Sequence, residues 1–142
     1  MPAHSKAGSV LLANPHPRLF DGLRGLLEAS FEQVFMVADA PSLIEGARKL
    51  QPALAVVDLS LAAGRLGPLL AEVRTAAPRT RTLLLSDHDD AHVDAAALVA
   101  GADGIVCKAR LAADLFDAVD AVLAGRRFSS PSARAEHRSG NR

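Results

Sequence analysis

Apolar residues follow two different spacings along this chain. Short, continuous apolar runs are separated by longer segments in which apolar residues recur every three or four positions. The short runs predict β-strands at 9–13, 34–38, 54–58, 81–86 and 104–108. The longer segments predict α-helices at 17–30, 41–50, 68–77, 90–101 and 111–125.

The alternation of strands and helices predicts the fold class. The strands are apolar at consecutive positions, as expected when both faces of a sheet are covered. Right-handed crossovers then give an α/β fold with a doubly wound parallel sheet of five strands and helices on both faces. Sites in such folds form at the carboxyl ends of the strands.

The first predicted helix contains two glycines, Gly22 and Gly25. A glycine inside a helix costs roughly 1 kcal/mol relative to alanine. We expect close packing of this helix against its neighbours to be the reason for both. They do not form a phosphate loop, because no glycine-rich turn follows the first strand.

Composition limits the class of protein. The 142 residues fit one domain, which we expect at 9–125, with an N-terminal extension at 1–8 and a disordered tail or truncated linker at 126–142. Lys and Arg number 16, as do Asp and Glu, so the zero net charge disfavours direct nucleic-acid binding. Cys107 is the single cysteine, which excludes a disulfide framework, and we expect it to be a small core residue.

The sequence also carries no sign of a membrane or secretory segment. No apolar run reaches the roughly 18 residues that span a bilayer, and residues 1–10 lack the apolar region of a signal peptide. We therefore expect a cytoplasmic protein that does not contact a membrane.

Chemically useful side chains follow several predicted strands. Asp58 ends the third strand, Ser86 ends the fourth, and Lys108 ends the fifth. The fold brings these ends to one edge of the sheet, so a carboxylate, a hydroxyl and an ammonium should cluster there. A carboxylate can accept a phosphoryl group, and the transfer depends mainly on positioning and on charge stabilisation, usually with a metal ion.

The first strand ends differently, in "LLANPHP" (11–17). Asn14 has only a neutral amide, and Pro15 has no side-chain ligand at all. His16 is most simply a residue at the start of a helix. This stretch is either a plain strand exit or an active-site loop that lacks its working groups.

Four segments together resemble the receiver domains of two-component response regulators. They are "VLLANPHPRLFDGLRGLLE", "LAVVDLSL", "RTLLLSDHDD" and "GADGIVCK", and the first and third are closest in wording to the NarL/FixJ type. The resemblance spans about 9–125. It implies a flavodoxin-like (βα)5 fold with strand order 2-1-3-4-5.

The resemblance assigns roles residue by residue. Asp58 matches the phosphoacceptor, Ser86 the hydroxyl that follows the phosphoryl group, and Lys108 the lysine that pairs with the acceptor. The family's acidic pair, which binds magnesium, falls on Asn14 and Pro15, so both acids are replaced. We expect Mg²⁺ binding to be weak, with Asp58 as the remaining metal ligand.

Two further positions depart from the family pattern. Ile105, three residues before the lysine, stands where the family usually has an aromatic switch residue. Asp87 follows Ser86, where a small or apolar residue is usual, and two interpretations stay open. Asp87 is either a substitute acid for the pocket or a solvated loop acid before the next helix, whose N-cap is Asp89 or Asp90.

His88 and His92 are four residues apart, a spacing that can bind metal on a helix. No glutamate lies between them and no third ligand is evident, so we do not expect a metal site there.

These observations predict a signalling domain rather than an enzyme. One hypothesis is an atypical receiver that acts by protein–protein interaction. An alternative is a phosphorylation-competent N-terminal receiver of a helix-turn-helix transcriptional regulator. A remote alternative is a small flavodoxin-like enzyme or cofactor binder, which would need a glycine-rich loop or a nucleophile elbow that the sequence lacks.

By the same resemblance, the expected partners are a sensor histidine kinase, an output domain or a second copy of the chain. They would bind at the face formed by the fourth helix, fifth strand and fifth helix.

Overall fold

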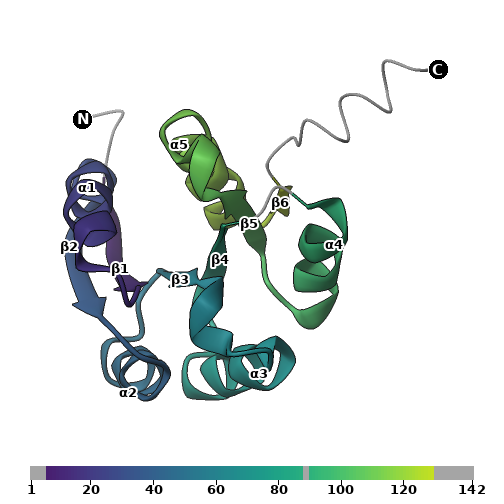
Figure 1. Ribbon diagram of the computed structural model, residues 1–142. Coiled ribbons are helices and arrows are strands. Elements are labelled where there is room, and N and C mark those ends of the chain that lie inside the picture. Colours follow the sequence, from purple (N-terminus) through teal and green to yellow (C-terminus); the bar gives the residue numbers. More distant parts are fainter. Residues whose placement is uncertain (1–5, 88–89, 130–142) are drawn as a thin grey trace.

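The computed structural model describes residues 6–87 and 90–129 of the chain. Within these residues, five α-helices and six parallel strands alternate (Figure 1). The strands are β1 (Ala7–Ala13), β2 (Phe31–Val37), β3 (Leu54–Asp58), β4 (Arg81–Ser86), β5 (Gly104–Cys107) and β6 (Phe128–Ser129). The helices are α1 (Pro17–Leu27), α2 (Ala40–Leu50), α3 (Leu66–Ala76), α4 (Ala91–Ala100) and α5 (Leu111–Leu123). Short 3-10 turns follow β3 at Leu59–Ala62 and β5 at Lys108–Arg110.

The strand order in the sheet is β2-β1-β3-β4-β5-β6. The predicted order of the first five strands is confirmed, and so is the doubly wound parallel topology. The prediction of a five-stranded sheet is corrected by the short strand β6, which pairs in parallel with β5 through Gly104 and Ile105.

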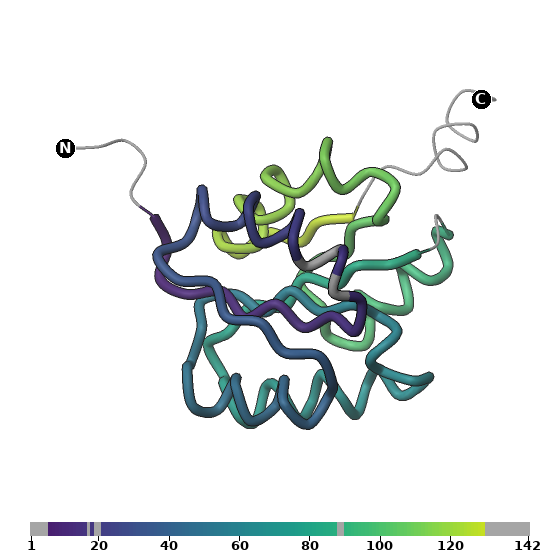
Figure 2. The backbone as a smooth tube through the Cα atoms, turned by 60° about the vertical axis from the view of Figure 1, so that its left-hand side comes forward, coloured from purple at the N-terminus to yellow at the C-terminus, as the bar shows by residue number. Residues whose placement is uncertain are grey.

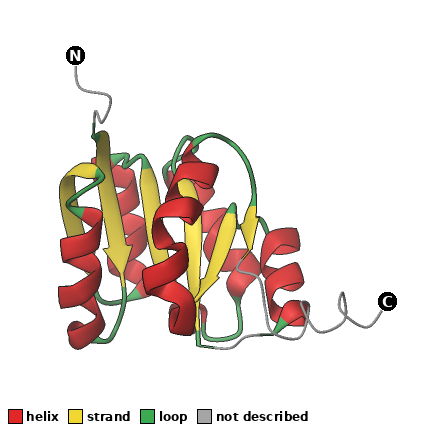
Figure 3. Ribbon diagram, turned by 90° about the horizontal axis from the view of Figure 1, so that it is seen from above, coloured by secondary structure: helices red, strands yellow, loops and turns green. Residues whose placement is uncertain are grey.

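The sheet lies between two helical layers, as Figures 2 and 3 show from two directions. Helices α1 and α5 cover one face, and α2, α3 and α4 cover the other. Successive residues of each strand point to opposite faces. In β1, for example, Val10 and Leu12 enter the α1–α5 core, whereas Leu11 and Ala13 enter the core on the other face.

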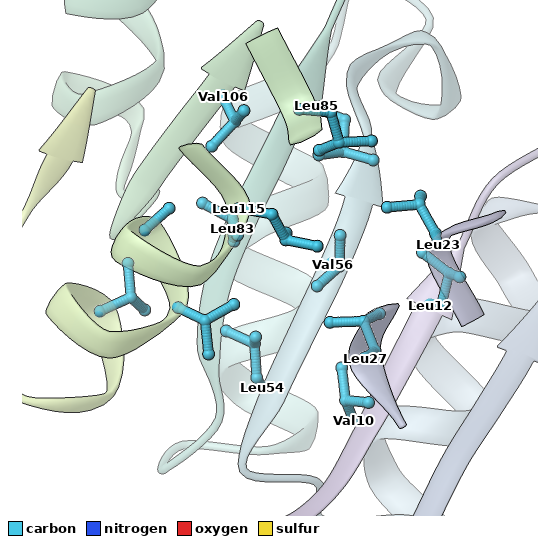
Figure 4. Close-up of a cluster of buried hydrophobic side chains, with 14 of the residues drawn as sticks. Val10, Leu12, Leu23, Leu27, Leu54, Val56, Leu83, Leu85, Val106 and Leu115 are labelled. Carbon is cyan, nitrogen blue, oxygen red and sulfur yellow. The ribbon is translucent and has the colours of Figure 1, made fainter. Parts of the chain in front are cut away.

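Aliphatic side chains dominate the core between the sheet and α1 and α5 (Figure 4). Leu23 and Leu27 from α1 and Leu115 from α5 meet β-strand residues such as Val56 and Leu83. All five are at most 1% exposed. Burial of such side chains stabilises a fold by about 1.5–3 kcal/mol each.

The two glycines of α1 have no packing role. A β-carbon built at Gly22 or at Gly25 meets no atom within 4 Å. Both residues are exposed. The prediction that close packing explains them is therefore wrong.

Some boundaries differ from the prediction. β1 begins at Ala7 and β2 at Phe31, because the two strands pair over their whole length from Ala7↔Phe31 to Ala13↔Val37. The first helix ends at Leu27 rather than at residue 30. The predicted N-cap of α4 is confirmed at Asp90, whose side chain accepts a hydrogen bond from the backbone N–H of His92. Within the described residues, no helix has both the length and the apolar character needed to cross a membrane.

Candidate functional site

The site lies at the carboxyl ends of β1, β3, β4 and β5. Parallel pairing aligns these ends, since Ala13 pairs with Val57, Asp58 with Leu85, and Ser86 with Cys107. The structure therefore brings Asn14, Asp58, Ser86 and Lys108 to one edge of the sheet, as the sequence predicted.

An ion pair between Asp58 and Lys108 dominates the site. Nζ of Lys108 lies 2.5 Å from Oδ2 of Asp58, and the Asp58 side chain is only 1% exposed. The other carboxylate oxygen, Oδ1, accepts a hydrogen bond of 2.9 Å from the backbone N–H of Ser60. Both oxygens of Asp58 thus already contact a donor.

A second carboxylate reaches the same ammonium. Oδ1 of Asp87 lies 3.0 Å from Nζ of Lys108, but the Asp87 side chain is 61% exposed. Lys108 itself is 16% exposed. It therefore links a buried carboxylate to one at the surface.

The contacts around Asp58 and Lys108 shift the pKa values of the two groups in the direction opposite to the effect of burial. Burial alone would raise the pKa of Asp58, but the hydrogen bonds from Lys108 and Ser60 and the Lys108 charge lower it below its ordinary value. Burial alone would lower the pKa of Lys108, but Asp58 and Asp87 raise it above its ordinary value. Both groups are therefore charged at neutral pH.

Asn14 follows β1, and its side chain forms a hydrogen bond with the nearby backbone. It is fully buried, and its Oδ1 accepts a hydrogen bond of 2.6 Å from the backbone N–H of His16. Nδ2 of Asn14 is buried and has no hydrogen-bond partner among the described residues. The expected role of His16 is confirmed, because it is the N-cap residue of α1. Pro15 is exposed.

The remaining candidates lie in strands β4 and β5. Ser86 is fully buried at the end of β4. Ile105 is 1% exposed and packs in the core beneath α2, α3 and α4. Cys107 is buried and forms no disulfide, which agrees with the core position expected for it.

Acidic, histidine and cysteine side chains do not form a metal cluster in residues 6–87 and 90–129. No group of three or more of them in those ranges is placed to hold a metal ion. His88 and Asp89 lie outside the described residues, so the pairing of His88 with His92 is not tested.

A family profile described as the response regulator receiver domain matches residues 10–120. The chain belongs to this family. Such receivers are signalling domains of two-component systems, in which they interact with histidine kinases and output domains.

Individual relatives agree with this assignment. The chain is 29% identical over 125 residues to the Fimbriae Z protein of Salmonella typhimurium, covering 87% of this chain and 60% of that protein. It is 25% identical over 130 residues to the transcriptional regulatory protein MctR of Rhizobium johnstonii, covering 85% and 58% respectively. The chain thus spans about three fifths of the length of these curated relatives.

The fold is also similar to that of a solved structure. The crystal structure of a two-component response regulator of the LuxR family from Aurantimonas sp. SI85-9A1 matches with a TM-score of 0.80 and 29% identity. The match covers 96% of this chain and 97% of that one.

Sequence reasoning missed two features of the site. The link from Lys108 to Asp87 was not predicted, although a third acid beside a lysine and a buried carboxylate is a signal that could have indicated it. The bond from Asn14 to the His16 backbone was also missed. An asparagine two residues before a helix-start position is a common signal for such a turn.

Proposed function

We propose that this domain is an atypical receiver that signals by protein–protein interaction, without depending on phosphorylation of Asp58. The observation that carries this proposal is the Lys108–Asp58 ion pair of 2.5 Å beside a strand end that carries Asn14 and Pro15. In our proposal the ammonium balances the buried carboxylate and takes the place of a divalent cation.

Magnesium does not fit the donors at this site. Mg²⁺ requires near-octahedral oxygen coordination and usually one or two carboxylates. Oδ2 of Asp58 faces the Lys108 ammonium. Oδ1 of Asn14 already accepts a hydrogen bond from the backbone N–H of His16. The side chain of Pro15 has no ligand atom. A cation that bound Asp58 here would share the carboxylate with the Lys108 ammonium, and the two positive charges would repel each other.

The remaining site residues have matching roles in this proposal. Asp58 occupies the phosphoacceptor position, and Ser86 and Lys108 occupy the positions that contact a phosphoryl group. Asp87 holds Lys108 from the solvent side rather than acting as a metal ligand. Ile105, buried in the core, replaces the aromatic switch residue, so the pocket and the surface are coupled differently from an ordinary receiver.

The partner surface we propose is the face formed by α4, β5 and α5. Helix α4 is rich in alanine and valine, and Val99 on it is 86% exposed. Phe116 on α5 is 41% exposed. Exposed apolar residues of this kind suit docking of an output domain, a histidine kinase or a second copy of the chain.

A phosphorylation-competent receiver of a transcriptional regulator is the second candidate. It is favoured by the preserved cluster of Asp58, Ser86 and Lys108, and by the greater length of relatives such as the transcriptional regulatory protein MctR. In that case Asp87 would have to supply the missing acid.

Intact-protein mass spectrometry separates the two candidates. The protein is incubated with acetyl phosphate and magnesium beside an Asp58→Ala variant and an ordinary receiver as positive control. Our proposal predicts no mass gain under conditions that modify the ordinary receiver. A gain of one phosphoryl group that is absent from Asp58→Ala would instead establish the second candidate.

A further inference from the structure

A surface hollow lies at the edge of the sheet opposite to Asp58. It has a volume of about 480 Å³ and is formed where the loop from α3 to β4 meets the loop from α4 to β5. Volumes of 300–1,000 Å³ are typical of small-molecule sites. Nothing in the proposed receiver function uses this hollow.

Three arginines line the hollow: Arg74 from the last turn of α3, Arg79 from the loop, and Arg81 at the start of β4. None of them forms an ion pair with a carboxylate in the described part of the chain. Their positive charges are therefore available to a ligand of opposite charge.

Arg74 is held in place at the wall of the hollow. Its Nη2 donates a hydrogen bond of 3.0 Å to the backbone carbonyl of Gly101, the C-cap of α4. A β-carbon at position 101 would lie 2.8 Å from that nitrogen. Glycine at this position therefore lets the guanidinium approach the end of α4.

Both loops around the hollow are also fixed. The hydroxyl of Thr80 donates a hydrogen bond of 2.6 Å to the carbonyl of Pro52. Oδ2 of Asp103 accepts one of 2.8 Å from the backbone N–H of Thr82. The first bond ties the α3–β4 loop to the α2–β3 connection, and the second ties the α4–β5 loop to the start of β4, so the hollow is formed in advance of any ligand.

Two features oppose an anion here. The Asp103 carboxylate lies in the lining, and α3 and α4 end beside the hollow with the negative ends of their dipoles, each about half a unit charge. Three guanidinium charges exceed these opposing charges. Arg126 and Arg127, which follow α5 at the same edge of the sheet, add to the positive potential.

We propose that this hollow binds a small anion that carries a diphosphate group. The planar guanidinium matches two phosphate oxygens at once, which favours phosphate over other anions. The hollow is larger than a single phosphate, and a diphosphate offers oxygens to more than one of the three guanidinium groups that line it. Inorganic pyrophosphate and a nucleoside diphosphate share this chemistry.

The test is an NMR titration of the ¹⁵N-labelled chain at low ionic strength and without magnesium. Inorganic pyrophosphate is the probe in one arm and ADP in the other. We expect saturable shifts of the backbone amides of Thr82, Gly101 and Asp103, and none at Ser86. Tighter binding of ADP would indicate a nucleotide ligand, and equal binding would indicate that the diphosphate alone is recognised.

Paired variants separate the site from general charge attraction. Arg79→Gln/Arg81→Gln removes two exposed charges from the hollow and should weaken binding about tenfold or more. Arg18→Gln/Arg65→Gln removes two exposed charges at the opposite edge and should leave the affinity unchanged. Equal weakening by both pairs, or no saturable shifts with either probe, would overturn the proposal.

Discussion

Lys108 is the residue on which the buried charge of Asp58 depends. Its ammonium lies 2.5 Å from a carboxylate that is 1% exposed, and it also reaches Asp87 at the surface. The pair is therefore asymmetric. Loss of Lys108 leaves a buried acid without its cation, whereas loss of the Asp58 charge leaves Lys108 with Asp87 and partial access to water.

Unfolding experiments should reveal this asymmetry. We predict that Lys108→Met lowers the free energy of unfolding at neutral pH by about 1–3 kcal/mol, because a buried charged acceptor loses its partner. Asp58→Asn should lower the free energy of unfolding by less than Lys108→Met does. In the double variant Asp58→Asn/Lys108→Met, the loss should be smaller than the sum of the two single losses. Strict additivity in urea denaturation would show that the two side chains do not interact.

The titration of Asp58 is a separate prediction. The folded-state pKa is lowered below the unfolded value of about 3.9, so the stability from this group is present above that value. It is lost as the pH falls through the folded pKa. In Lys108→Met, burial should prevail and raise the pKa above the ordinary value. ¹³C NMR of the Asp58 carboxyl measures both, and an unchanged pKa in the variant would contradict this account.

The sequence predicts which site residues lie together where those residues stand at the ends of strands. Asp58, Ser86 and Lys108 each end or follow a strand of recognisable pattern, so their clustering followed from topology. The geometry of Asn14 did not, because its bond to the His16 N–H depends on how the chain turns after β1. The Asp87–Lys108 contact joins two loops, and its distance follows only from tertiary structure.

At the scale of elements, long apolar patterns predicted strands and helices well and short ones failed. Phe128–Ser129 is a two-residue strand in a segment without apolar periodicity. It forms because β5 offers a free edge, and backbone pairing with Gly104 and Ile105 supplies its hydrogen bonds. Similarly, the start of β2 was not predicted, because the exposed polar residues Glu32 and Gln33 interrupt its apolar run.

The packing of β5 against α5 yields a further prediction. A β-carbon at Gly104 would lie 2.9 Å from Cγ2 of Val122 and 3.0 Å from Cδ1 of Leu83. Gly104→Ala should therefore destabilise the fold by about 1–3 kcal/mol through overpacking.

Gly25→Ala is the matched control for that substitution. Position 25 is exposed in α1 with open space around it, so alanine should stabilise the helix by up to about 1 kcal/mol. Thermal unfolding of both variants measures the contrast. If the Gly104→Ala protein is as stable as the Gly25→Ala protein, the close packing of Val122 and Leu83 around position 104 is contradicted.

At the scale of the whole molecule, the net charge does not show that the two edges of the sheet differ in charge. The chain carries 16 basic and 16 acidic residues. At one edge, the Asp58–Lys108 pair keeps a buried charge balanced. At the other, Arg74, Arg79 and Arg81 have no carboxylate partners within the described ranges. The zero net charge disfavours direct nucleic-acid binding, but it does not indicate where basic side chains gather on the folded molecule.

A magnesium titration tests most directly whether Lys108 takes the place of the cation at Asp58. It compares the unmodified chain with Asn14→Asp/Pro15→Asp, which returns two carboxylates to the end of β1, and follows the Ser60 and Ser86 amides by NMR. We predict that the variant binds Mg²⁺ at least about tenfold more tightly, and that adding Asp58→Asn abolishes the gain. Equal affinity of the unmodified chain and the variant would contradict the account.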